Sequence, residues 1–105
     1  MRDLEEAFGL VGRRHYYRSN NHLTAAFAAC DLREILATKT DTPNCPDKTS
    51  ETHLIWMLDQ LIDLKVQGEK AHRWLGFVQG IMVSRGYITV DAERDRTRVI
   101  FTGFE

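Results

Sequence analysis

The sequence predicts a small, mainly α-helical single domain built on an antiparallel pair of helices at about residues 51–65 and 69–85. Three observations support this fold class. The chain has 105 residues, which is the size of one domain. Its composition, 43% hydrophobic and 28% charged, is typical of a folded soluble protein rather than a disordered one. Apolar residues recur at spacings of three and four residues over the second half of the chain, as they do on one face of a helix.

Residues 1–37 are expected to form an N-terminal helical segment. Apolar residues between Leu4 and Val11 recur at helical spacing, and Gly12 is expected to end this short helix. A second helix is predicted from residue 23 to residue 36, after asparagines suited to capping. On this helix we place Phe27 and Cys30 on the apolar stripe, so Cys30 is expected in the core.

Residues 38–50 are predicted to form a loop, because they contain both prolines and many Thr, Asp and Asn residues. The loop is long for a compact domain, which leaves a binding role open. We favour a tether between the N-terminal segment and the helical pair, with Cys45 exposed.

The helical pair occupies the start of the region 51–105. Either Ser50 or Thr52 is the candidate N-cap for its first helix, and Gly68 supplies the permissive backbone for a tight break before the second. Trp74 lies on the apolar face of the second helix, where it is expected to anchor the core. A Trp beside Arg73 could alternatively serve as a binding hot spot.

Gly76 and Gly80 lie one turn apart inside the second predicted helix. Each glycine lowers helix stability by about 1 kcal/mol relative to alanine at such a position, so two of them in one helix indicate a specific structural role. We expect them to allow close approach of another backbone, from either the preceding helix or a second chain. Trp74, Gly76 and Gly80 are therefore the predicted helix-packing or oligomer contact.

Two alternative structures are predicted for the C-terminal tail. In the first, Asp91 caps a charged run that forms one or two helical turns, after which residues 99–104 pack back on the helical pair. In the second, residues 87–90 pair with residues 98–102 as a short β-hairpin, because both flanks are β-prone.

Charged residues are balanced: 14 Lys and Arg residues and 15 Asp and Glu residues give a net charge of −1. Bulk charge therefore does not indicate nucleic acid or an anionic membrane as the partner. Local clusters are more informative. A Tyr-Arg patch of the kind found at protein interfaces comprises Arg13, Arg14, Tyr16, Tyr17 and Arg18. Three alternating arginines form a second candidate partner-binding set, namely Arg94, Arg96 and Arg98. Their neighbouring acids could equally neutralise them within a helix.

No catalytic motif is present. The sequence lacks a phosphate-binding loop, a nucleophile elbow and clustered metal ligands, so we expect no enzyme activity, no cofactor and no metal. It also lacks an apolar run long enough to span a bilayer, and its first residues do not resemble an export signal. A cytoplasmic location with two reduced cysteines is therefore expected, although a bridge between Cys30 and Cys45 stays open.

Three strings carry a resemblance to a known group: HLIWML at residues 53–58, RWLGFVQG at residues 73–80 and VDAERDRTR at residues 90–98. Over about residues 52–101 the chain resembles short accessory proteins of temperate phages and prophages. The pattern of that group usually has a proline where this chain has Val99. The resemblance implies a phage gene expressed in a bacterial cytoplasm, and it implies no catalytic residues.

The function expected from these observations is a non-enzymatic binding protein that inhibits or modulates a host protein complex, such as a defence or recombination nuclease. One alternative is an oligomeric sponge for an anionic nucleotide signal, with Gly76 and Gly80 at the subunit contact. A nucleic-acid-binding regulator is less favoured, because neither strong helix has a basic face. No membrane partner is expected.

Overall fold

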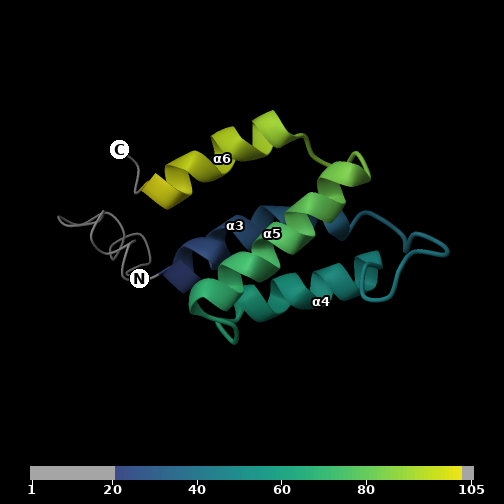
Figure 1. The fold of residues 1–105 in the computed structure, drawn as a ribbon, viewed down its shortest axis with the longest axis horizontal. Coiled ribbons are helices and arrows are strands. Elements are labelled where there is room, and N and C mark those ends of the chain that lie inside the picture. The colour runs from purple at the N-terminus through teal and green to yellow at the C-terminus, as the bar shows by residue number, and fades with distance from the viewer. Residues whose placement is uncertain (1–20, 103–105) are drawn as a thin grey trace.

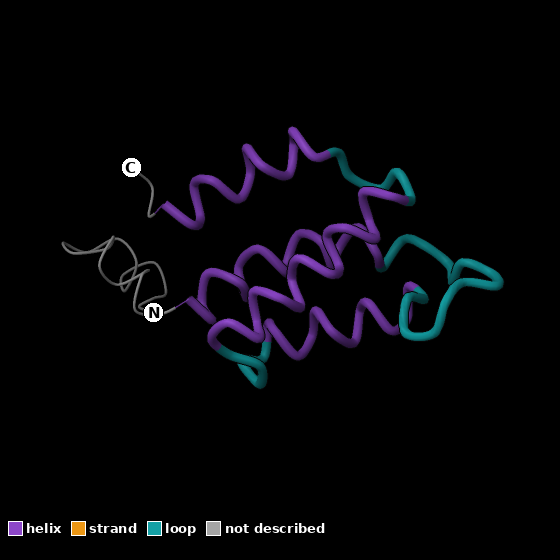
Figure 2. Tube along the Cα trace, viewed as in Figure 1, coloured by secondary structure: helices purple, strands orange, loops and turns teal. Residues whose placement is uncertain are grey.

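The computed structural model describes residues 21–102, which form four α-helices and no strand (Figures 1 and 2). In chain order these are α3 (Asn21–Leu36), α4 (Glu51–Ile62), α5 (Gly68–Ser84) and α6 (Val90–Thr102). The predicted mainly α-helical class is confirmed. The helix expected near residues 2–11 and the Tyr-Arg patch at residues 13–18 lie outside the described residues.

Helix α3 is the centre of the fold and contacts α4, α5 and α6. Its buried face consists largely of alanines, with Leu32 and Leu36 toward its C-terminal end. Alanine loses no side-chain entropy on burial and allows neighbouring helices to approach closely. The expected stripe through Cys30 was therefore wrong: Cys30 is exposed, and its Sγ donates to the Ala26 carbonyl at 3.4 Å.

Helices α4 and α5 form the predicted antiparallel pair (Figure 1). The hydroxyl of Ser50 accepts a hydrogen bond from the His53 amide at 3.1 Å, which confirms Ser50 as the N-cap of α4. The chain then turns through Leu64 and Gly68, both with positive φ. Helix α4 ends at Ile62, three residues before the predicted end, because this turn begins earlier than Gly68.

The two helices of this pair contact α3 more extensively than they contact each other. Apolar side chains from both helices lie against α3 in one core, with Leu54 and Leu58 from α4 and Val78 and Met82 from α5 fully buried. The hairpin is thus splayed over α3, and the seam between α4 and α5 is left partly open.

Gly76 and Gly80 do not serve the close packing expected within the chain. Both are exposed, and a Cβ added at either glycine would have no atom within 4 Å among its neighbours. The alternative in which α4 approaches closely here was wrong, because Gly76 is exposed on α5 and Gly80 borders a cleft between α5 and α6. A contact with a second chain stays a prediction.

The loop at residues 37–50 is attached to the ends of α4 and α5 through the buried carboxylate of Glu51. This carboxylate accepts hydrogen bonds from the amide and hydroxyl of Thr42 and from the hydroxyl of Tyr87, each at 2.6 Å. It also pairs with Arg85 at 3.1 Å, and Arg85 donates to the Thr49 carbonyl at 2.6 Å. Burial alone would raise the pKa of Glu51, but the hydrogen bonds from Thr42 and Tyr87 outweigh it and lower the pKa to about 2.

The C-terminal segment forms helix α6, so the alternative β-hairpin was wrong, and so was the expected one or two turns. Thr89 caps this helix instead of Asp91: its hydroxyl accepts from the Ala92 amide at 3.1 Å, and its carbonyl accepts from the Glu93 amide at 3.0 Å. Glu93 and Thr97 lie one turn apart and are both buried. A helix presents these two residues on one face, whereas an isolated hairpin would leave its strands without a sheet to join.

Candidate functional site

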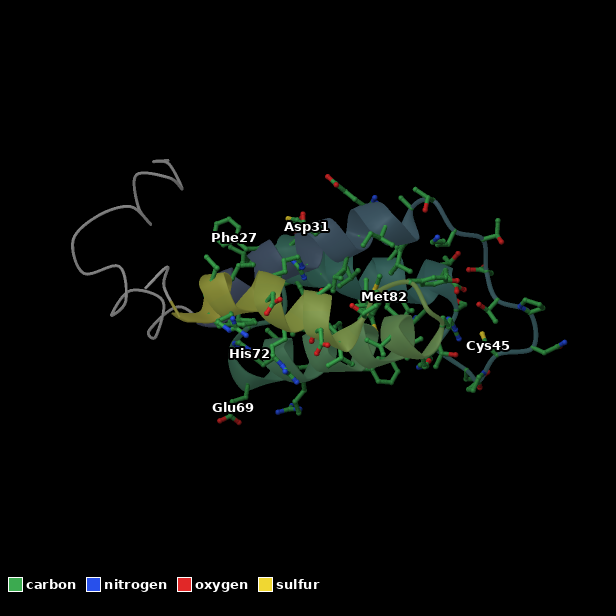
Figure 3. All side chains as sticks on the ribbon, turned by 90° about the horizontal axis from the view of Figure 1, so that it is seen from above. Phe27, Asp31, Cys45, Glu69, His72 and Met82 are labelled. Atoms are coloured by element: carbon green, nitrogen blue, oxygen red, sulfur yellow. The ribbon has the colours of Figure 1, made fainter. Side chains whose placement is uncertain are left out.

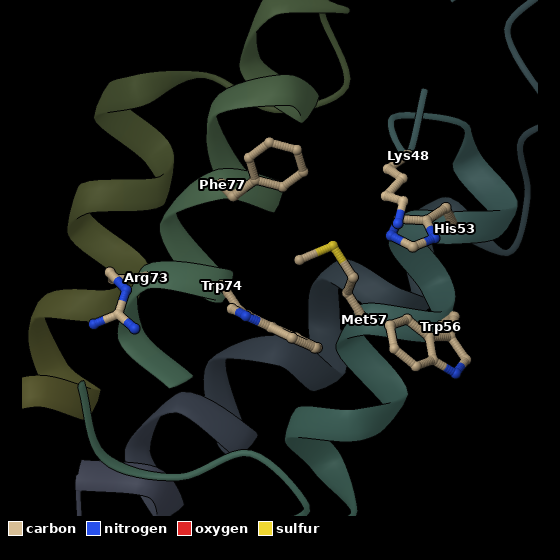
Figure 4. Close-up of a pocket in the computed structure, with 7 residues that line it drawn as sticks. All are labelled: Lys48, His53, Trp56, Met57, Arg73, Trp74 and Phe77. Carbon is tan, nitrogen blue, oxygen red and sulfur yellow. The ribbon is translucent and has the colours of Figure 1, made fainter. Parts of the chain in front are cut away.

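The open seam between α4 and α5 forms an apolar groove of about 480 Å³ (Figure 4). We call it the aromatic groove. Its lining consists of Lys48, His53, Trp56, Met57, Arg73, Trp74 and Phe77. Its volume falls within the range of sites that bind small molecules.

The walls of the aromatic groove are made by large side chains that the core does not bury. Trp56 on α4 is 48% exposed and Phe77 on α5 is 45% exposed, while Met57 lies buried at the base. Trp74 is partly buried and packs against the core, as the sequence predicted. The Trp56 and Trp74 rings lie with centroids 5.7 Å apart and planes inclined at 41°, so the two tryptophans meet across the seam.

Cations surround this apolar surface. Lys48 comes from the loop that precedes α4, and Arg73 comes from α5 on the other side of the groove (Figure 4). One turn before Trp74, the ammonium group of Lys70 lies 5.5 Å from the centre of the Trp74 ring. Within residues 21–102, none of these three bases forms an ion pair, and no carboxylate lines the groove.

The lining of the aromatic groove is mainly apolar, with Lys48, His53 and Arg73 as its polar side chains. The lining contains one histidine and no Ser, Thr, Cys, Asp or Glu side chain. Across residues 21–102, no group of three or more His, Cys, Asp or Glu side chains is placed to hold a metal ion. What the groove offers is an apolar cavity with aromatic walls and positively charged edges.

The three arginines of α6 occupy different environments. Arg96 donates to Glu93 at 2.6 Å, to Asp31 at 3.0 Å and to the Ala28 carbonyl at 3.1 Å, and it therefore joins α6 to α3, from which Asp31 projects (Figure 3). Arg94 and Arg98 are exposed and lie 3.9 Å and 3.2 Å from Asp91 and Asp95, respectively. Local charge pairing thus accounts for much of this run, and Arg96 has a structural role.

The two cysteines are free thiols at separate places in the fold. Cys45 lies in the loop at one end of the molecule (Figure 3) and is half-buried rather than exposed. Partial burial raises the pKa of the Cys30 thiol, and the carboxylates of Asp31 and Glu34 raise it further. A raised pKa keeps the thiol protonated, so Cys30 has little nucleophilic character.

A second, shallower cleft of about 360 Å³ separates α5 from α6. Its lining consists of Gln79, Gly80, Val83, Val90, Glu93, Arg94 and Thr97. Gln79 donates to the Glu93 carboxylate at 2.7 Å and so bridges the two helices. Because Gln79 and Thr97 are already hydrogen-bonded to Glu93 and the cleft lacks aromatic walls, it is a weaker candidate than the aromatic groove.

No family model, curated protein or solved structure matches the chain. The site therefore rests on its own geometry. None of the helices in residues 21–102 has both the length and the apolar character needed to cross a bilayer.

Sequence reasoning singled out Trp74 and Arg73 but missed the groove they help to form. The signal for Trp56 and Phe77 was present, because both lie off the buried stripes of their helices. A large aromatic residue off the stripe must face solvent or a partner. What periodicity did not show is that the two residues flank the same seam.

Proposed function

We propose that the protein is a non-enzymatic binding protein that holds a partner protein by an apolar side chain inserted into the aromatic groove. The observation that supports this proposal is the pair of half-exposed aromatic residues, Trp56 and Phe77, at an open apolar seam. Contiguous exposed apolar surface on a small domain is typical of an interaction site.

Aromatic and arginine residues supply most of the binding energy at protein interfaces, particularly where they border a pocket that loses water on binding. Trp56, Trp74, Phe77 and Arg73 provide this combination. The buried Met57 at the base offers a flexible, polarisable surface that adapts to different side chains.

The setting of the proposal comes from the resemblance to phage accessory proteins. It supports a bacterial host protein or complex as the partner, with inhibition of a defence or recombination nuclease as the consequence of binding. In this proposal Arg94 and Arg98, which are exposed on α6, and the Tyr-Arg patch at residues 13–18 contribute secondary contacts.

The test is affinity capture from host lysate with three forms of the full chain: wild type, Phe77→Glu and Val99→Glu. Val99 is a matched control, because it is 44% exposed and lies on α6, away from the groove. A partner identified by mass spectrometry should then be purified and titrated against each form.

We expect Phe77→Glu to weaken binding of the purified partner by about 30-fold or more, as hot-spot substitutions do, and Val99→Glu to leave it nearly unchanged. Equal affinity of the wild type and Phe77→Glu would exclude the groove as the binding site.

A further inference from the structure

We infer that the partner segment bound in the aromatic groove carries carboxylates on either side of its apolar anchor. The inference rests on the proposed function and names the chemistry of its partner.

The cations at the groove differ from the other arginines of the described residues. Arg73 is the one arginine in residues 21–102 that has no carboxylate partner. The paired arginines are Arg33 with Asp59, Arg85 with Glu51, Arg94 with Asp91, Arg96 with Asp31 and Glu93, and Arg98 with Asp95. The guanidinium of Arg73 is therefore available to a carboxylate from outside the chain.

Lys48 and Lys70 extend this positive charge to both sides of the apolar surface. Lys48 approaches from the loop side of α4 (Figure 4), whereas Lys70 and Arg73 belong to the first half of α5. A segment whose apolar anchor lies on the surface formed by Trp56, Trp74 and Phe77 therefore has its flanks next to cations. Carboxylates on those flanks would add attraction, and lysines would add repulsion.

The same charges argue against a second copy of this chain as the occupant. A symmetric dimer that joined groove to groove would place Lys48, Lys70 and Arg73 of one copy near the same residues of the other. Like charges brought together in this way oppose association.

Single-stranded nucleic acid also binds surfaces with aromatic and basic residues. Stacking of a base requires an open aromatic face. Here the Trp56 and Trp74 rings are turned toward each other at 41°, and Lys70 lies over the Trp74 ring. The groove favours an aliphatic or aromatic side chain over a stacked base, and nucleic acid becomes an outcome of the test.

The chain offers a direct readout of groove occupancy. Trp56 and Trp74 are its two tryptophans, and both line the groove. Intrinsic tryptophan fluorescence of the full chain therefore reports on binding at this site without a label.

The experiment titrates the full chain with three short amphipathic peptides that share the same Leu and Phe anchors and lack Trp. Their flanking residues are all Glu, all Gln or all Lys. An exposed ion pair contributes a modest amount each, so three pairs should make the Glu peptide bind about tenfold more tightly than the Gln peptide. The Lys peptide should bind most weakly, and added salt should reduce the differences.

The matched variant is K48Q/K70Q/R73Q, which removes the three charges but keeps the aromatic walls. It should bind the Glu and Gln peptides equally, with the Gln peptide bound as by the wild type. If the wild type binds the Glu and Gln peptides equally well, the inference is wrong and the proposed function stands. If no peptide changes the fluorescence, the inference is also wrong. The proposed function is refuted as well only if the Phe77→Glu variant still binds the purified partner as tightly as the wild type does.

Two further measurements address the other occupants. Saturable quenching by oligothymidylate that is lost in K48Q/K70Q/R73Q would overturn the inference in favour of nucleic acid. A dimer mass by light scattering that becomes monomeric in Phe77→Glu would overturn it in favour of a second copy.

Discussion

Replacing Gly80 with alanine should stabilise this protein. Alanine is favoured over glycine by about 0.8–1 kcal/mol in a helix interior, because glycine loses more backbone freedom on folding. No steric cost offsets this gain, since an added Cβ at Gly80 has no atom within 4 Å among its neighbours, and the residue is exposed. For a domain of this size, the gain corresponds to a rise in melting temperature of about 4–8 °C. Gly76→Ala should act in the same way.

Thermal and urea unfolding followed by circular dichroism would measure the effect. Gly86→Ala is the matched control, because its added Cβ also has no atom within 4 Å, but its φ is +78°. A left-handed conformation is unfavourable for alanine by about 1–2 kcal/mol, so Gly86→Ala should destabilise the protein. The pair of variants separates helix propensity from backbone strain in equally open space.

An unchanged or lower melting temperature for Gly80→Ala would refute this reasoning. It would mean that another backbone occupies the space beside the glycine, and the same variant should then lower the mass measured by light scattering. That result would restore Gly76 and Gly80 as an oligomer contact.

Two further substitutions test the polar contacts that hold the fold together. Glu51→Gln should lower the free energy of unfolding by about 3 kcal/mol, measured in urea, because it removes a buried charge on which several donors converge. Arg96→Gln should speed hydrogen exchange of the α6 amides, because it removes the link from α6 to Asp31 and the Ala28 carbonyl. Arg94→Gln, which loses only an exposed contact at 3.9 Å, should leave that exchange unchanged.

The pH dependence of stability should follow Glu51. Its pKa is about 2 in the folded state and 4.5 for the unperturbed group, so the unfolded chain binds the proton more readily. The contribution of this carboxylate is therefore complete above about pH 5 and is lost as the pH falls toward 2, and it amounts to about 3 kcal/mol. The Glu51→Gln variant should show a smaller loss of stability over the same range, and an identical loss would contradict this assignment.

Most helix positions followed from local sequence because their signals are short in range. Ser50 caps α4 through its own hydroxyl, and the apolar spacing of α4 and α5 marked both helices and their buried faces. The same reasoning failed on α3, which is only weakly amphipathic. When alanines form the buried face of a helix, a prediction that assigns larger apolar residues such as Cys30 to the core places the wrong face inward.

The secondary structure of the C-terminal segment could not be predicted from local sequence. Its sequence is compatible with a helix or a β-hairpin, and the decision depends on contacts with distant residues. Arg96 reaches Asp31 and Ala28 of α3, and Gln79 of α5 reaches Glu93. These partners lie far along the chain, so no local pattern identifies them.

By itself the sequence determined the helical class, the positions of α3, α4 and α5 and the antiparallel pair, because periodicity, caps and turn residues act over a few neighbours. Only the tertiary structure decided that α4 and α5 would separate over α3 and leave Trp56 and Phe77 beside an open seam. The angle between two helices depends on the side chains of the third helix on which they rest. Both helices contact the alanine surface of α3 more extensively than they contact each other, and the aromatic groove lies along the seam that this arrangement leaves between them.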